Sequence, residues 1–311
     1  MKLQVLPACR TWEDHLFAHL NSLIETQYYN YLAAHRRIPA LVQKFPVYDA
    51  IQHHGGQDAK FLPRIIDTLR NNGELQDEIR ESQRIIQGAL MSERLTDIVA
   101  ELSRQLDVYK KDPEYEPSDE ERSRGLDISD FRLLRVVVHI LLVLKGLDAG
   151  FSSETPEGQQ AENVIAGYME LLAEAGKHEL IPLYAGHLSK KRASKVMGEI
   201  LVKVINEDTR VRLLGLMKDY DIDIPDALRH MINNVFELTH QRYARIPLPS
   251  WTGILAQENS GINDSSLLKE EDEQMIRALE WMLLVPELKQ QIMGDGCIAY
   301  KRFFCEFTLL A

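Results

Sequence analysis

Apolar residues recur along this 311-residue chain at intervals of three and four, the spacing that places them on one face of an α-helix. The clearest case is ENVIAGYMELLAEAGKHELIPLYAGHL, from Glu162 to Leu188. Two apolar helical faces follow each other in it, formed by Val164, Tyr168, Leu171, Leu172 and Ala175 and then by Leu180, Ile181, Tyr184, His187 and Leu188. Gly176 stands between them, where a left-handed C-cap is expected. A helical hairpin with apolar outer faces needs a neighbour on each side, as in a stacked α-solenoid.

The other segments between loops follow the same helical period, and no alternation of apolar and polar residues predicts a strand. We expect a long first helix with Thr11 as its N-cap and one apolar face formed by Trp12, Leu16, Leu20, Leu23, Ile24 and Tyr31. Further helices are expected over 47–54, 59–70, 74–88, 92–109, 129–147, 189–206, 208–219, 225–245, 265–284 and 287–308. The predicted fold class is therefore all-α, an irregular α-solenoid of stacked antiparallel helix pairs.

Three stretches interrupt the helical pattern, and we expect a mobile loop at each: 110–127, 151–160 and 245–266. The first is charged and contains two prolines, and the last is rich in proline and glycine. We interpret residues 1–311 as one helical module. Its last residues, FFCEFTLLA, continue an apolar helix without a cap, so we expect this chain to be a fragment of a longer solenoid.

The end of the chain also supplies the candidate contact residues. Phe303, Phe304, Phe307 and Leu309 form an apolar cluster that the preceding helices cannot wholly cover. We predict that they pack against tail helices, and an interface with another chain is the alternative.

Composition narrows the class of function. The formal net charge is −11, and an acidic surface repels phosphate backbones, which disfavours direct nucleic-acid binding. The most apolar run, Val136–Leu144, is about half the length that a bilayer crossing requires. Because it is apolar on all sides, we interpret it as a helix buried among other helices. The three cysteines fit neither a disulfide framework nor a zinc motif.

A search for catalytic, cofactor-binding or metal-binding residues yields none. His15 and His19 have the i, i+4 spacing of a helical zinc site, but Leu16 and Leu20 beside them indicate a half-buried face instead. His139 lies inside the apolar run, and we interpret it as a core histidine rather than a base or ligand. No phosphate-binding loop or nucleophile elbow occurs.

Three segments together resemble one family. They are LPACRTWEDHLFAHLNSL from Leu6 to Leu23, EAGKHELIPLYAGHL from Glu174 to Leu188, and RALEWMLLVP from Arg277 to Pro286. In this order they resemble a scaffold nucleoporin of the outer ring of the nuclear pore, the family named Nup-eighty-four in fungi and Nup-one-hundred-seven in vertebrates. Each match is a packing pattern and not a chemical motif.

The resemblance implies a fold-back trunk like that of vesicle-coat proteins, and a structural role without catalysis or cofactor. It implies a place in the Y-shaped complex of the nuclear pore at the nuclear envelope, in support of nucleocytoplasmic transport and mRNA export. In the family, the N-terminal side joins the central stem nucleoporin and the tail joins the nucleoporin at the stem's end. Two alternatives stay open: a helical adaptor or vesicle-coat or lid-type subunit, and an all-α enzyme that uses His139.

Overall fold

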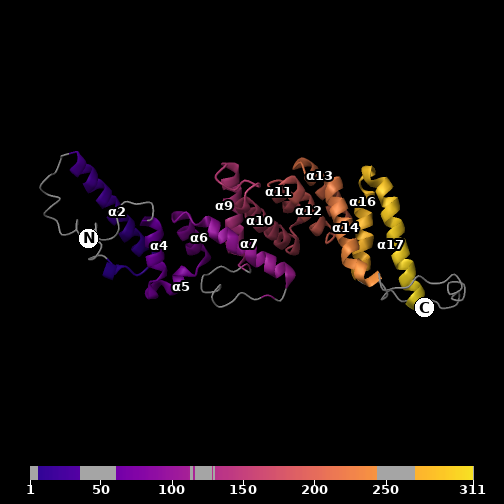
Figure 1. The fold of residues 1–311 in the computed structure, drawn as a ribbon, viewed down its shortest axis with the longest axis horizontal. Coiled ribbons are helices and arrows are strands. Elements are labelled where there is room, and N and C mark those ends of the chain that lie inside the picture. The colour runs from indigo at the N-terminus through magenta and orange to yellow at the C-terminus, as the bar shows by residue number, and fades with distance from the viewer. Residues whose placement is uncertain are drawn as a thin grey trace. The chain divides into compact units, whose positions relative to one another are not determined.

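The structure is a computed structural model that describes residues 6–35, 61–112, 115, 128, 130–243 and 270–310. It falls into two compact units, residues 1–151 and 152–311 (Figure 1). Every regular element in the described residues is helical, which confirms the all-α prediction. Among these residues, no helix has both the length and the apolar composition that crossing a membrane requires.

The described part of the first unit consists of three longer helices, α2, α7 and α9, with shorter ones between them. Its helices are η1 (Leu6–Ala8), α2 (Trp12–Ala34), α4 (Phe61–Arg70), η2 (Gly73–Leu75), α5 (Gln76–Ile79), α6 (Ser82–Met91), α7 (Leu95–Lys111) and α9 (Phe131–Gly146). Helix α4 packs on α2, and α6 contacts α4, α7 and α9. The core at the start of the unit is formed by Trp12, Leu16, Ile65, Ile66, Leu69 and Leu75.

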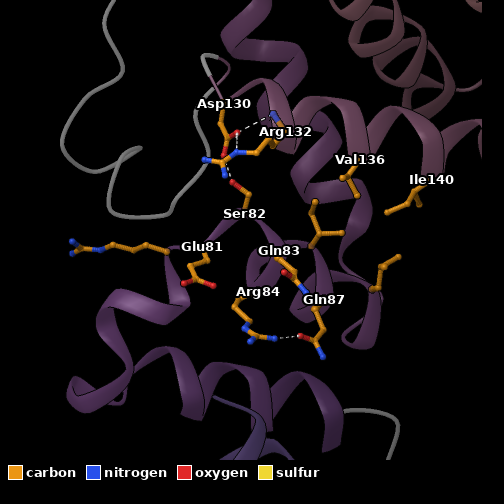
Figure 2. Close-up of a pocket in the computed structure, with 12 residues that line it drawn as sticks. Glu81, Ser82, Gln83, Arg84, Gln87, Asp130, Arg132, Val136 and Ile140 are labelled. Atoms are coloured by element: carbon orange, nitrogen blue, oxygen red, sulfur yellow. Dashed lines mark hydrogen bonds and ion pairs between the residues drawn. The ribbon is translucent and has the colours of Figure 1, made fainter. Parts of the chain in front are cut away.

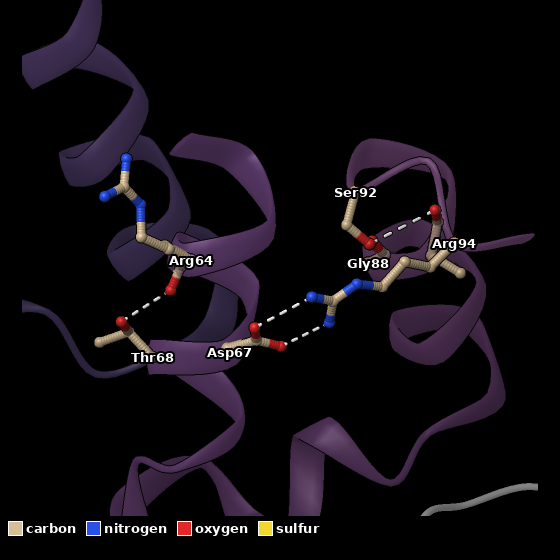
Figure 3. A network of polar contacts seen from close by, with 7 residues as sticks. Arg64, Asp67, Thr68, Gly88, Ser92 and Arg94 are labelled. Atoms are coloured by element: carbon tan, nitrogen blue, oxygen red, sulfur yellow. Dashed lines mark hydrogen bonds and ion pairs between the residues drawn. The ribbon is translucent and has the colours of Figure 1, made fainter. Parts of the chain in front are cut away.

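A polar network fixes the turn between α6 and α7 against α4. The Arg94 guanidinium donates from both Nη atoms to the Asp67 carboxylate, at 2.7 and 3.2 Å (Figure 3). The Ser92 hydroxyl donates to the Gly88 carbonyl at 2.6 Å and satisfies a carbonyl at the end of α6. The turn passes through Glu93, whose φ of 58° is in the left-handed region.

In the second unit, short turns join the described helices from α10 to α14, and those from α16 to α17. Its helices are α10 (Pro156–Glu174), η3 (His178–Leu180), α11 (Ile181–Ala185), α12 (Lys190–Leu201), α13 (Glu207–Asp219), α14 (Ile224–Tyr243), α16 (Glu270–Leu283), η5 (Pro286–Leu288) and α17 (Lys289–Leu310). Helix α10 contacts α12, α12 contacts α14, α14 contacts α16, and α16 contacts α17 (Figure 1). Each helix packs on its neighbours in the row, which is the packing logic of a solenoid.

Helix α12 approaches α14 closely at a glycine. A Cβ at Gly198 would lie 2.7 Å from the Ala227 carbonyl oxygen and 2.8 Å from the Met231 nitrogen. Both atoms belong to the α14 backbone, so only glycine allows the two helices to pack at this distance.

Several predicted helix ends agree with the structure. Thr11 precedes α2 and its hydroxyl accepts the Asp14 N–H at 3.2 Å, as expected of an N-cap. Gly176 has φ 69° after α10, and Pro225 is in the first turn of α14. Helix α10 is longer than the sequence pattern indicated, because the Thr155 hydroxyl caps it and Pro156 begins it. The connection predicted over 151–160 therefore ends at Thr155.

Other expectations were wrong or fall outside the described residues. The helix predicted over 74–88 is interrupted, because Glu81 is extended (φ −65°, ψ 130°) between α5 and α6. On α2, Ile24 and Tyr31 do not continue the buried face, and they are 61% and 56% exposed. The helix predicted over 47–54 and nearly all of the predicted loops 110–127 and 245–266 lie outside the described residues.

The apolar run Val136–Leu144 is not buried on all sides. In α9 the side chains of Val137, Val138 and Leu141 are fully buried, but Val136 is 45% and Val143 is 61% exposed. Neighbouring helices of the unit cover only one face of α9. In the hairpin after α10, Ile181, Tyr184 and Leu188 are buried as predicted, whereas Leu180 and His187 are exposed.

Candidate functional site: packing motifs and an open groove

The first of the three sequence segments forms a helix start held from two sides. Thr11 and Asp14 make a reciprocal capping box, since the Asp14 carboxylate accepts the N–H of Thr11 and of Arg10, each at 3.1 Å. The backbone N–H of Trp12 donates to the carboxylate of Glu78, on α5, at 2.7 Å. The Trp12 indole is 1% exposed in the core of the first unit. This segment therefore anchors α2 to α5 and to the core.

The capping box predicts a pH effect of definite sign. Hydrogen bonds from the Arg10 and Thr11 N–H groups hold the pKa of Asp14 below its ordinary value. The stabilisation is thus present above the ordinary pKa of about 3.9 and is lost as the pH falls through the lower folded-state value. Asp14→Asn should lower the urea midpoint at pH 7, and by less at about pH 3.

Circular dichroism of urea unfolding at both pH values measures this difference. Asp77→Asn, at an exposed carboxylate of the same unit, is the matched control and should change stability by less than about 0.5 kcal/mol. An Asp14→Asn effect that is equal at both pH values would contradict the capping account.

The hairpin segment centres on a buried carboxylate. Glu162 on α10 is 4% exposed and accepts hydrogen bonds from the Ser189 N–H at 2.8 Å, the Ser189 hydroxyl at 2.9 Å and the Ser153 hydroxyl at 2.5 Å. Ser189 is the N-cap of α12, so the carboxylate satisfies a free N–H at that helix start. Next to it, the Asn163 side chain accepts from Arg192 of α12 at 2.6 Å. These contacts fix the start of α12 against α10.

Glu162→Gln should therefore lower the free energy of unfolding by about 1–2 kcal/mol, because an amide NH₂ replaces one acceptor oxygen and the charge is lost. The measurement is a urea titration followed by circular dichroism. Glu174→Gln, at an exposed position near the end of the same helix, is the control and should stay within about 0.5 kcal/mol of the parent. Equal effects of the two substitutions would refute the role assigned to Glu162.

Side chains of the third segment, on α16, donate hydrogen bonds to carbonyl groups at the end of α12. Three carbonyls that follow or end this helix each accept a side-chain donor: Leu201 from the Trp281 indole N–H at 3.0 Å, Val204 from Arg210 Nε at 3.0 Å, and Val202 from Arg277 Nη1 at 3.4 Å. The Arg210 guanidinium lies 5.7 Å from the centre of the Trp281 ring and also donates to Glu280 at 2.7 Å.

Trp281 is fully buried and Arg210 is 5% exposed, so the cluster joins α12, α13 and α16 in the interior of the second unit. The orphan carbonyls at a helix end are satisfied here by side chains from two other helices. Trp12 and Trp281 thus both take part in helix–helix contacts.

An open groove of about 1010 Å³ lies between α6 and α9 in the first unit (Figure 2). The Ser82 hydroxyl and the Asp130 carboxylate meet at one end of it, and Val136 and Ile140 line its other end. A second hollow of about 420 Å³ continues along α9 past His139 and Val143. This groove was not predicted, because the sequence analysis treated the whole of Val136–Leu144 as buried.

The histidine and cysteine residues considered as possible catalytic or metal-binding groups do not form such a site in the described part of the structure. His139 is exposed, with its Nδ1 2.6 Å from the Arg135 carbonyl oxygen of the preceding turn, so the core position expected for it is wrong. His15 and His19 are buried on α2. Within the described residues, no group of three or more His, Cys, Asp or Glu side chains could hold a metal ion. Burial raises the pKa of the Cys9 thiol, which keeps it protonated.

The candidate contact residues stay a prediction. The backbone of α17 is described to Leu310. The side chains of Phe303, Phe304, Phe307 and Leu309 lie outside the described part of the structure, so neither the tail-packing nor the interface hypothesis is tested.

Comparison with known proteins places the three packing clusters within one family match. A family model described as nuclear pore protein 84 / 107 matches residues 3–311, which include all three clusters and the groove. The chain belongs to this family. The resemblance identified from the three sequence segments is thereby confirmed.

Curated relatives of the family extend well beyond this chain. Nucleoporin NUP84 of Chaetomium thermophilum is 27% identical over 341 residues, covering 97% of this chain and 35% of that protein. Nucleoporin nup107 of Schizosaccharomyces pombe is 26% identical over 236 residues, which cover 75% of this chain and 26% of that protein. Nuclear pore complex protein Nup107 of Homo sapiens is 21% identical over 302 residues, which cover 96% of this chain and 28% of that protein. The chain thus spans about a third or less of the length of these relatives.

Proposed function

We propose that this chain is a structural segment of a nuclear pore scaffold nucleoporin, located at the nuclear envelope and supporting nucleocytoplasmic transport and mRNA export. The observation that carries the proposal is the match of the nuclear pore protein 84 / 107 family model to residues 3–311. The structure supports a scaffold role physically. Helix contacts run from α10 through α12, α14 and α16 to α17, and such continuous packing between neighbours is what an extended scaffold requires.

The finer parts of the proposal concern partners and shape. Residues 1–311 act as one helical module, part of a fold-back trunk like that of vesicle-coat proteins. The parent protein joins the central stem nucleoporin of the Y-complex on its N-terminal side and the stem-end nucleoporin through its tail. The module catalyses no reaction, and it contacts proteins rather than nucleic acid, in keeping with its formal charge of −11.

Affinity capture of the tagged full-length protein, with quantitative mass spectrometry, tests these partners. The proposal predicts the central stem and stem-end nucleoporins in amounts comparable to the bait. Recovery of vesicle-coat or proteasome-lid subunits in their place would favour the helical adaptor. The enzyme alternative gains no support from His139, which is exposed beside hydrophobic residues of a single helix.

A further inference from the structure

The groove between α6 and α9 combines an apolar floor with exposed arginines, and this combination points to one kind of ligand. Its floor follows one face of α9, at Val136, Ile140, Val143 and Leu144, and includes Leu90 of α6. The 45% exposure of Val136 and Leu90 and the 61% exposure of Val143 leave a continuous apolar strip uncovered. Such a strip at helical spacing is complementary to the apolar face of another helix.

The charged side chains around this strip are mainly cationic. Arg80, Arg132 and Arg135 are exposed, and the Arg132 side chain is 94% exposed, 3.9 Å from Asp130. A fourth arginine, Arg84, is paired with Glu13 of α2. Neither α6 nor α9 contains an acidic residue, although acidic residues exceed basic ones by 47 to 36 in the whole chain.

The carboxylates near the groove are already engaged or lie at its edge. Asp130 caps α9 by accepting from the N–H groups of Arg132 and Leu133, and it also accepts from Ser82. Glu81 and its neighbour Arg80 also line the groove, just before α6, and Glu81 lies on the side away from Val136 and Ile140 in Figure 2. The exposed arginines along α9 are therefore available to carboxylates from outside.

We infer that this groove binds an amphipathic, acidic helix of a partner protein. The apolar face of the ligand helix lies on Val136, Ile140 and Val143, and its carboxylates pair with Arg132 and Arg135. Helix α9 has 16 residues, so the ligand helix spans about 15 residues, or roughly 22 Å. The inference rests on the proposed scaffold function, because it assigns one of the surfaces by which the segment contacts another protein.

Charge favours this partner over two other occupants. A basic helix would bring its cations against the exposed Arg132 and Arg135, and a wholly apolar one would make no use of these two arginines. Specificity would come from the arginine rim and affinity from the apolar floor.

Fluorescence anisotropy with two designed peptides tests the inference on the 311-residue chain. Both peptides are labelled 15-residue helices with leucine on one face, and the other face carries glutamate in one peptide and lysine in the other. The chain should bind the glutamate peptide at least tenfold more tightly. The double variant R132E/R135E should reverse this preference, and V136S/V143S should weaken binding of the glutamate peptide at least fivefold.

Controls separate binding from folding. All four substituted side chains are exposed, so the urea midpoints of both variants should match the parent. The inference is overturned if neither peptide saturates, or if the R132E/R135E variant retains its preference for glutamate. It is also overturned if light scattering shows that the parent chain forms a dimer and that the V136S/V143S variant is a monomer.

These outcomes are independent of the proposed nuclear pore role. If R132E/R135E loses peptide binding while the full-length protein still captures nucleoporins, the groove is real and serves one contact among several. If the groove binds the peptide but full-length protein captures no nucleoporins, the scaffold assignment fails and the binding surface stands.

Discussion

Trp281→Ala is expected to lower the free energy of unfolding of the second unit by about 3–5 kcal/mol. The ring is fully buried, so its removal opens a cavity among α12, α13 and α16. The substitution also removes the donor to the Leu201 carbonyl and the aromatic face beside the Arg210 guanidinium. A buried arginine would then keep its charge with less compensation, which adds to the cost.

Urea unfolding followed by circular dichroism measures the loss. Leu283→Ala is the matched control, because Leu283 is on the same helix and 66% exposed. It should cost less than about 1 kcal/mol. Trp281→Phe fills most of the space but cannot donate to Leu201, so it should lie between the two. If Trp281→Ala cost no more than Leu283→Ala, the cluster would not hold these three helices together.

Gly198→Ala is expected to be the next most damaging change, at about 3 kcal/mol, the upper end of the usual cost of overpacking. The added Cβ would lie 2.7–2.8 Å from two backbone atoms of α14, which cannot move aside as a flexible side chain could. Helices α12 and α14 must separate, and the packing of Val196, Met197 and their neighbours on α14 loosens.

The control uses a glycine in open space. Gly215 is inside α13, and a Cβ there would meet nothing within 4 Å. Gly215→Ala should therefore stabilise the chain by about 0.5–1 kcal/mol, the usual helix-propensity gain. Opposite signs for the two Gly→Ala substitutions, measured by urea unfolding, are the result that supports close contact of α12 and α14. A stabilising Gly198→Ala would refute it.

The helical period predicted most of the helices because it depends only on the spacing of apolar residues three and four positions apart. Trp12 and Trp281 lie at apolar positions of helices that the spacing predicted, and both are in the core. Helix ends with local signals, such as Thr11 and Gly176, were also predictable, since each cap is made by residues within a few positions of it.

Features that depend on distant residues could not be predicted in this way. Glu162 reads as a solvent-exposed carboxylate, and it is buried because Ser189 of a later segment supplies two of its donors. The run Val136–Leu144 is apolar all round, and which face stays open depends on where other helices pack. Gly198 interrupts a helical pattern, which was a usable signal of close packing, but its partner helix was not predictable.

The location of the tagged full-length protein, expressed from its own locus in living cells, tests the central claim most directly. If the chain is a segment of a nuclear pore scaffold nucleoporin, the fluorescence is predicted to form a punctate rim at the nuclear envelope, coincident with a pore marker. Fluorescence spread through the cytosol, or gathered on vesicles without a nuclear rim, would contradict the account.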